Sequence, residues 1–169
     1  MKGGQVTVLA HVITVSDRVA NGTREDLSGE LASERLTAAG YQTHASVVPD
    51  GAQEVEHALR AALATGARLV ITSGGTGVTP RDRTPEGTRP VIDREVPGLA
   101  ELVRAEGARK TPFAALSRGL VGVVDAGPSH PGALVINLPG SPKGVAEGLD
   151  VLLPLVSHVL DQISGGDHA

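Results

Sequence analysis

Cysteine and tryptophan are absent from this chain of 169 residues, which contains one tyrosine, Tyr41, and one phenylalanine, Phe113. Without cysteine there is no disulfide, no thiolate nucleophile and no zinc–thiolate site. With so few aromatic rings the core must be aliphatic, and stacking of single-stranded nucleic acid on aromatic side chains is disfavoured. A formal net charge of -4 also argues against a reader of phosphate backbones. We therefore expect no nucleic-acid partner.

Long hydrophobic runs are missing as well. No apolar stretch approaches the roughly 18 residues of a membrane-spanning helix, and the N-terminus lacks the pattern of a signal peptide. The chain is nevertheless 40% hydrophobic and long enough to bury a core. We expect one cytoplasmic domain over residues 1–169 without a membrane partner, in which residues 1–4 and 165–169 are frayed.

The hydrophobic residues follow strand and helix periodicities in alternation. Runs rich in β-branched residues predict strands over 5–15, 41–48, 69–72, 120–124 and 133–138. Helical spacing predicts helices over 27–39, 52–65, 85–95, 97–106, 111–116 and 144–163, with a loop over 19–26. Strands that alternate with single amphipathic helices imply right-handed crossovers. The predicted fold is α/β: a three-layer, doubly wound, mostly parallel sheet with helices on both faces.

Three details of the helices are specific enough to test. Leu99, Leu102 and Val103 should be buried by the helix over 97–106. Thr84 precedes a proline and an acid, which is typical of an N-cap. Pro154 should kink the last helix, because proline removes a hydrogen bond from a helix interior.

A glycine-rich loop follows the predicted strand over 69–72 and reads Ser73, Gly74, Gly75, Thr76, Gly77. Glycine takes positive φ at little cost and lets an anion approach backbone N–H groups. Open α/β sheets bind ligands beyond the carboxyl ends of their strands, so this loop should form the floor of a crevice. It is neither a Walker phosphate loop, because no Gly-Lys-Ser/Thr follows, nor a dinucleotide fingerprint. The alternative is a tight turn without a ligand.

Acidic residues accompany the strand ends. Asp50 is a candidate catalytic carboxylate, and its alternative role is an N-cap, in a capping box with Gln53. Asp82 lies between Arg81 and Arg83, so a solvated ion pair is its alternative. The alternative for Ser16 and Asp17 is a purely structural role at the end of a strand.

The remaining polar residues also have structural alternatives. Ser141 resembles an N-cap, yet the helix start that carries Lys143 is also suited to an anion. The six histidines show no ligand spacing and are expected to bind no metal.

Five groups of residues converge on one predicted rim: 16–18, 49–50, 73–77 with Asp82, 117–118 and 137–143. The motifs within and around them run through nearly the whole chain: Thr-Val-Ser-Asp-Arg (14–18), Val-Pro-Asp (48–50), Thr-Ser-Gly-Gly-Thr-Gly (72–77), Arg-Asp-Arg-Thr-Pro-Glu (81–86), Leu-Ser-Arg (116–118) and Asn-Leu-Pro-Gly-Ser-Pro-Lys-Gly (137–144). Each motif is weak alone, but together they are specific. On these motifs the chain resembles the MogA/MoaB family of molybdenum cofactor biosynthesis proteins and is similar to the G domain of gephyrin.

The resemblance implies adenylylation of molybdopterin with ATP and Mg²⁺, giving adenylyl-molybdopterin and pyrophosphate. Asp50 and Asp82 match the family's essential acidic pair, which would hold Mg²⁺ and orient the phosphates of ATP. Gly51 departs from relatives that often carry a second acid there. The expected nucleotide- and molybdopterin-binding residues are Ser16, Asp17, Ser73, Gly74, Gly75, Thr76, Gly77, Ser117, Asn137, Pro139, Gly140, Ser141 and Lys143.

The resemblance also implies a homotrimer, or a hexamer made of trimers, that supplies a downstream molybdate-insertion protein. Two alternatives remain open. One is a MoaB-like oligomer that binds molybdopterin without turnover. The other is a CinA-like hydrolase of nucleotide pyrophosphates on the same fold.

Overall fold

The computed structural model describes residues 7–166. Four strands form the parallel part of one six-stranded sheet: β1 (Leu9–Val15), β2 (Gln42–Val48), β3 (Leu69–Ser73) and β6 (Ala133–Leu138). The remaining strands, β5 (Val121–Val124) and β4 (Arg94–Glu95), complete the order β2-β1-β3-β6-β5-β4. β5 is antiparallel to both of its neighbours. The predicted α/β, mostly parallel sheet is therefore confirmed.

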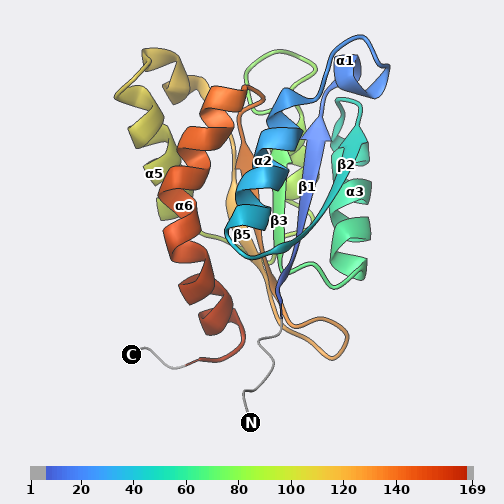
Figure 1. Ribbon diagram of the computed structural model, residues 1–169, viewed down its shortest axis with the longest axis vertical. Coiled ribbons are helices and arrows are strands. Elements are labelled where there is room, and N and C mark those ends of the chain that lie inside the picture. Colours follow the sequence, from blue (N-terminus) through green and yellow to red (C-terminus); the bar gives the residue numbers. More distant parts are fainter. Residues whose placement is uncertain (1–6, 167–169) are drawn as a thin grey trace.

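Helices cover both faces of the sheet (Figure 1). One face packs against α2 (Leu27–Ala38), α5 (Pro97–Ala108) and α6 (Pro142–Ile163), and the other against α3 (Ala52–Ala64). Three short elements complete the chain: α1 (Asp17–Ala20), α4 (Thr84–Thr88) and the 3₁₀ helix η1 (Pro112–Leu116). Within residues 7–166, no helix combines the length and apolarity needed to cross a bilayer.

The core is aliphatic, as the composition required. The buried hydrophobic residues are alanine, valine, leucine and isoleucine, while Phe113 is 76% exposed. In α3, Val55, Leu59 and Ala62 are fully buried at helical spacing. This burial fixes α3 beside β1 and β3, so the loop that precedes α3 reaches the carboxyl edge of the sheet.

Several predicted boundaries were wrong. The helix expected over 85–95 ends at Thr88, because Pro90 cannot continue it, and Arg94 and Glu95 instead form β4. The loop expected over 19–26 begins with the short helix α1. Leu102 is 42% exposed rather than buried, because α5 is buried mainly through Ala100 and Gly107.

The ends of the chain were only partly tested. Residues 1–4 and 167–169, expected to be frayed, lie outside the described residues, as do residues 5 and 6 of the first predicted strand. Gly165 and Gly166 follow the end of α6 and are exposed. Helix α6 continues through Pro154, and the predicted kink there stays a prediction.

Candidate functional site

The carboxyl ends of β1, β2, β3 and β6 meet at one edge of the sheet, at the top of Figure 1. A cavity of about 370 Å³ lies there. Its lining includes Ser16, Asp50, residues 73–77, Asp82 and residues 140–142. The structure thus brings together most of the residues that the sequence placed on one rim.

The glycine loop is shaped by two backbone conformations that other residues rarely adopt. Gly74 and Gly75 have φ angles of 107° and 66°. A Cβ atom on Gly74 would lie 2.3 Å from the carbonyl oxygen of Val15, a backbone atom that cannot swing away. Glycine is therefore required at Gly74 for close packing of the loop against β1, in addition to its φ angle.

Thr84 fixes the other side of this loop. Its hydroxyl donates to the Gly74 carbonyl at 2.7 Å, and its backbone N–H donates to the Gly75 carbonyl at 3.0 Å. The prediction that Thr84 caps a helix was wrong, since Arg83 occupies the N-cap position of α4. The hydroxyl of Thr84 donates its hydrogen bond to a carbonyl of the glycine loop instead.

The loop is also tied to the segment that follows β6. The Ser73 hydroxyl donates to the Pro139 carbonyl at 3.1 Å, and the Gly74 N–H donates to the Leu138 carbonyl at 3.1 Å. Gly140 approaches Gly74 closely, because a Cβ atom on Gly140 would lie 3.2 Å from the Gly74 Cα. The two glycine-containing loops therefore form one continuous surface.

Helix α6 begins on that surface. Ser141 is its N-cap, and the Ser141 hydroxyl accepts a hydrogen bond from the Gly144 N–H at 3.1 Å. Ser141 also lines the cavity, so the capping interpretation is confirmed, and the anion site at this helix start stays a prediction. The positive end of this helix of 22 residues therefore borders the cavity, where it favours a negative charge.

Asp50 does not cap a helix, so that alternative was wrong. The N-cap of α3 is Gly51, which makes no side-chain cap bond. The Asp50 carboxylate instead accepts a hydrogen bond from the Asp17 N–H at 3.0 Å, and the Asp17 carboxylate accepts one from the Asp50 N–H at 3.1 Å. This reciprocal pair crosses from β2 to β1 and directs Asp50 into the cavity.

The surroundings of Asp50 raise the pKa of its carboxyl group. Burial is the largest cause, and the negative charges of Asp17 and Asp82 act in the same direction. The Asp17 N–H and the Arg81 guanidinium oppose the rise. A carboxylate with a raised pKa, in a cavity and near a second carboxylate, indicates a functional site.

Arg81 forms a two-pronged ion pair with Asp17, with Nη2 at 2.8 Å from Oδ2. It also donates to the Asp50 carbonyl at 3.0 Å. Asp17 itself is not among the residues that line the cavity, but its contacts with Arg81 and Asp50 support the wall. Ser16 lines the cavity and caps α1 by accepting from the Val19 N–H.

Asp82 is held by its own loop. Its Oδ2 atom accepts hydrogen bonds from the N–H and hydroxyl of Thr79, at 3.0 and 2.9 Å. The proposed ion pair with its neighbours was wrong, because Arg81 pairs with Asp17 and Arg83 donates to the Pro80 carbonyl. Asp82 therefore presents its charge to the cavity without a neutralising side chain from either neighbour.

The two carboxylates suit a magnesium ion that is held jointly with phosphate groups. Within residues 7–166, the hydrogen bonds to both carboxylates reach Oδ2, and neither Oδ1 atom accepts one there. No cluster of three or more histidine, cysteine or acidic residues able to hold a metal occurs in that described part. Magnesium is commonly bound by one or two carboxylates, waters and substrate phosphates, so the donor set fits.

A second cavity of about 290 Å³ adjoins the first. Thr76, Gly77 and Ser141 line both. Its walls come from α5, η1 and the start of α6, and they are largely apolar. Among the predicted site residues, Ser117, Pro139 and Lys143 belong to this second cavity.

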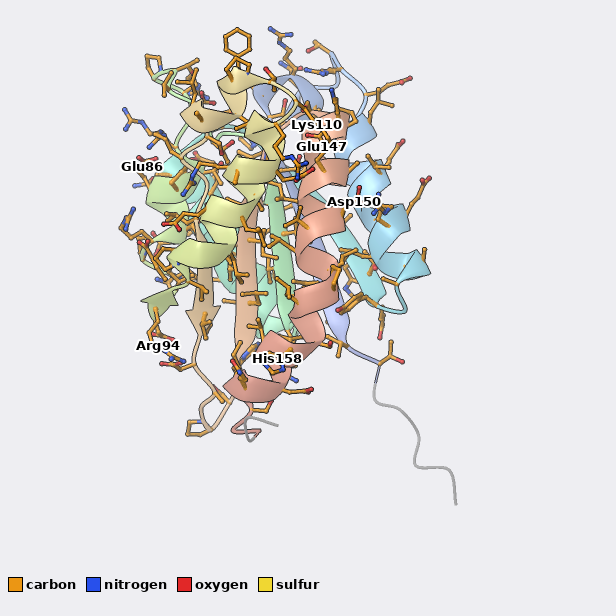
Figure 2. The ribbon with its side chains drawn as sticks, turned by 90° about the vertical axis from the view of Figure 1, so that its left-hand side faces the viewer. Glu86, Arg94, Lys110, Glu147, Asp150 and His158 are labelled. Atoms are coloured by element: carbon orange, nitrogen blue, oxygen red, sulfur yellow. The ribbon has the colours of Figure 1, made fainter. Side chains whose placement is uncertain are left out.

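Charged side chains also belong to the second cavity, whose lining includes Lys143 and Glu147, and Figure 2 shows Lys110 beside Glu147. Glu147 lies 3.3 Å from the Lys110 ammonium and 3.9 Å from that of Lys143. Glu147 is mostly covered, with 15% of its side chain exposed, whereas Lys143 is 74% exposed. Lys143 is therefore accessible to an anionic ligand from solvent, beside its ion pair with Glu147.

Asn137, predicted as a binding residue, is not among the residues that line these two cavities. Its amide donates to the hydroxyls of Thr72 and Thr88 at 2.9 Å each. Its carbonyl oxygen accepts from the Leu120 N–H at 3.1 Å. With 4% exposure, Asn137 links β3, α4 and the start of β5, because a buried amide needs all of its partners inside the protein.

Sequence reasoning missed several residues of the first cavity. Arg24 and Glu25 line it, but residues 19–26 were interpreted only as a polar loop, and Ser28 lines it from the first turn of α2. The signal was available, since that loop follows the carboxyl end of a predicted parallel strand. Arg118 was placed on the rim without a role.

Together these features define an α/β protein with a polar crevice suited to phosphates and an adjoining apolar cavity. The family model described as "Probable molybdopterin binding domain" matches residues 11–158. The chain therefore belongs to this MogA/MoaB family of molybdenum cofactor biosynthesis proteins, which confirms the resemblance seen in the motifs.

Similar proteins agree with this membership. A molybdopterin adenylyltransferase of Pyrococcus furiosus is 39% identical over 150 residues, covering 88% of this chain and 87% of the relative. A molybdenum cofactor biosynthesis bifunctional protein of Synechococcus elongatus is 42% identical over 168 residues, covering 98% of this chain. The chain spans about half the length of that second relative, 50%. The solved structure of the Mog protein from Mycobacterium ulcerans matches with a TM-score of 0.84 and 43% identity, covering 93% of this chain and 99% of that chain.

Proposed function

We propose that this protein catalyses the ATP- and Mg²⁺-dependent adenylylation of molybdopterin. The observation that carries the proposal is the placement of Asp50 and Asp82 on one cavity beside the glycine loop. The name of the Pyrococcus relative, which matches nearly along its whole length, supports the same reaction.

The two cavities suit the two substrates. The first is polar and is bounded by the glycine loop and by the N-terminus of α6, so it suits the phosphates of ATP. The second is mostly apolar and suits the flat ring system of a pterin. The shared residues Thr76, Gly77 and Ser141 mark the point where the terminal phosphate of molybdopterin would meet the α-phosphate of ATP.

The reaction transfers an adenylyl group between phosphates. A terminal phosphate oxygen of molybdopterin attacks the α-phosphorus of ATP, and a new P–O–P bond forms. The bond between the α-phosphorus and the bridging oxygen breaks, and its electron pair leaves with pyrophosphate. No nucleophilic side chain is required, which suits a chain without cysteine.

Catalysis would then rest on position and charge. Asp50 and Asp82 must be ionised to hold Mg²⁺, which supplies positive charge to the reacting phosphates when bound. The glycine loop and the start of α6 would stabilise the charge that develops on the phosphate oxygens. Arg81 neutralises Asp17, which limits the repulsion between the site and an anionic substrate.

The direct test is incubation of the purified protein with molybdopterin, ATP and Mg²⁺, followed by assay of adenylyl-molybdopterin and pyrophosphate. Both products are expected from the wild type, and Asp82→Asn should abolish them while the circular dichroism spectrum stays unchanged. Asp125→Asn is the matched control, because Asp125 pairs with Arg94 away from the cavity.

Other outcomes identify the alternatives. Tight molybdopterin binding without product would support a non-catalytic binding protein. Release of pyrophosphate or AMP from nucleotide substrates without molybdopterin would support a CinA-like hydrolase. Either result would overturn the transferase proposal.

The assembly implied by the family belongs to the same proposal. We expect a cytoplasmic homotrimer, or a hexamer of trimers, that delivers its product to a molybdate-insertion protein. Family membership supports this expectation. Light scattering of the full chain would give the number of subunits, and a monomeric mass would contradict it.

A further inference from the structure

Arg118 makes the most extensive set of contacts around the loop that carries Asp82. It lies between η1 and β5, and 36% of its side chain is exposed. Its Nε donates to the Gly77 carbonyl at 2.7 Å, and its Nη2 donates to the Asp82 carbonyl at 2.7 Å. Its backbone N–H donates to the Thr76 carbonyl at 2.8 Å. Arg118 is therefore hydrogen-bonded both to the glycine loop and to the segment that carries Asp82.

Glu86 completes the arrangement. Its carboxylate forms an ion pair with the Arg118 guanidinium, and this hydrogen bond is the main reason why the pKa of Glu86 is lowered. Glu86 belongs to α4, which begins two residues after Asp82. A planar guanidinium can donate to three segments in fixed directions, whereas a lysine ammonium offers one charge on a flexible stem.

The hydrogen bonds that Asp82 makes through its own side chain are local. They join Asp82 to Thr79, and the Asp82 N–H also donates to the Thr79 carbonyl. Such bonds shape the loop without fixing its position relative to the sheet. Val78 is 66% exposed, so the tip of this loop gains little support from the core.

Two arginines connect this loop to other elements. Arg81 reaches Asp17 and Asp50 on one side, through an ion pair in which 64% of the Arg81 side chain is exposed. Arg118 reaches Gly77 and Asp82 on the other side, through shorter bonds to backbone carbonyls. The location of Asp82 therefore depends on both arginines, and Arg118 is the one whose side chain bonds to Asp82 itself.

We propose that Arg118, paired with Glu86, is a positioning residue. It holds the Asp82 carboxylate and the glycine loop in the relative position that adenylyl transfer requires. This inference rests on the proposed function, and it assigns to Arg118 no contact with the substrates. A small displacement of a group that holds reacting phosphates is expected to slow the reaction about 100-fold.

The test compares Arg118→Lys and Arg118→Ala with the control Arg94→Lys. Arg94 also forms an ion pair with an acid, Asp125, but Figure 2 shows Arg94 on β4 well away from Glu86. The first measurement needs no substrate. Amide hydrogen exchange of residues 76–82 should accelerate at least about 10-fold in Arg118→Lys, while exchange in β3 stays unchanged.

The second measurement is turnover. Arg118→Lys should lower kcat by about 10- to 100-fold, with the KM for molybdopterin within about twofold. The Mg²⁺ concentration that gives half-maximal rate should rise. Added guanidinium ion should restore part of the rate to Arg118→Ala, and Arg94→Lys should behave as the wild type.

The outcomes separate this inference from the proposed function. A wild type that forms no adenylyl-molybdopterin would overturn the proposed function, while hydrogen exchange would still decide whether Arg118 holds the loop. Normal turnover and unchanged exchange in Arg118→Lys would overturn the positioning role. If Arg118→Ala does not fold, Glu86→Gln provides the second variant, and wild-type exchange and kcat in Glu86→Gln would contradict the paired role.

Discussion

The negative charge of the Asp50 carboxylate lowers the stability of the folded protein. Because burial and the neighbouring acids raise its pKa in the folded protein, the folded state binds more protons than the unfolded state above the ordinary pKa of aspartate. Stability therefore falls as pH rises from that ordinary value through the raised one, and the cost of ionised Asp50 is present at neutral pH. Functional sites commonly carry such a cost.

Asp50→Asn should separate stability from activity. Adenylylation should be abolished, because the amide cannot supply the negative charge that holds Mg²⁺. Urea unfolding at pH 7 should show a midpoint equal to or above that of the wild type, since the amide oxygen still accepts from the Asp17 N–H and no helix cap is lost. A clearly lower midpoint would show that the carboxylate has a stabilising role that its contacts do not indicate.

Arg81→Gln should change the pH dependence of the reaction. Arg81 is one of the groups that lower the pKa of Asp50, and it also neutralises Asp17. Its removal should raise the pKa of Asp50 further, so the acidic limb of the pH–rate profile should move to higher pH. The control Arg81→Lys keeps the charge and should move the limb less.

Salt provides an independent check of this shift. Arg81 is largely exposed, so its effect on Asp50 is screened by ions. The separation between the profiles of the wild type and Arg81→Gln should shrink at high salt. If the pH–rate profiles of the wild type and Arg81→Gln coincide at low salt, Arg81 does not influence the pKa of Asp50.

At the scale of elements, the glycine loop depends on close packing between β1 and the turn after β3. Gly74→Ala should destabilise the protein by about 1–2 kcal/mol through its positive φ and by about 1–3 kcal/mol more through the clash with the Val15 carbonyl. Gly22→Ala is the matched control, because Gly22 also has a positive φ, 78°, but an added Cβ would meet nothing within 4 Å.

The comparison isolates the contribution of packing. Denaturant unfolding should show a loss in Gly74→Ala well beyond that in Gly22→Ala, and turnover should fall only in Gly74→Ala. Equal losses in both variants would mean that φ strain alone accounts for the requirement for glycine.

At the scale of the whole molecule, the site lies between segments that come from most of the chain, from Ser16 to Ser141. Binding of a ligand across these segments should therefore stabilise the whole fold. A ligand at 100 times its Kd adds about 2.7 kcal/mol to the free energy of unfolding. Mg²⁺ with ATP should thus raise the thermal midpoint of the wild type by several degrees.

The double variant Asp50→Asn/Asp82→Asn should lose the magnesium-dependent part of this rise. Scanning calorimetry with ATP, in the presence of Mg²⁺ or of EDTA, would measure it. An equal rise in the wild type and the double variant would contradict a joint role of the two carboxylates in holding the cation.

The sequence by itself determined the repeating strand and helix units, the aliphatic core and the meeting of polar residues at the carboxyl edge. These features are local or follow from simple rules: β-branched runs form strands, Leu59 and its neighbours recur at helical spacing, and parallel strands end on the same side. It also predicted the short helix of η1 and the buried strand β6. The prediction was wrong where two local signals competed. Helical spacing favoured a helix over 85–95, but Pro90 ends α4 at Thr88.

Only the tertiary structure decided which side chains pair. Arg81 joins Asp17 across 64 residues of sequence, Arg118 joins Gly77 across 41, and Asn137 joins Thr72 across 65. Spacing along the chain cannot select such partners, and for Asp50 and Asp82 it offered nearer alternatives, a helix cap and a neighbouring charge. The packing of the sheet and its helices settles the choice, because it sets which donors and acceptors come within hydrogen-bonding distance and which are buried away from water.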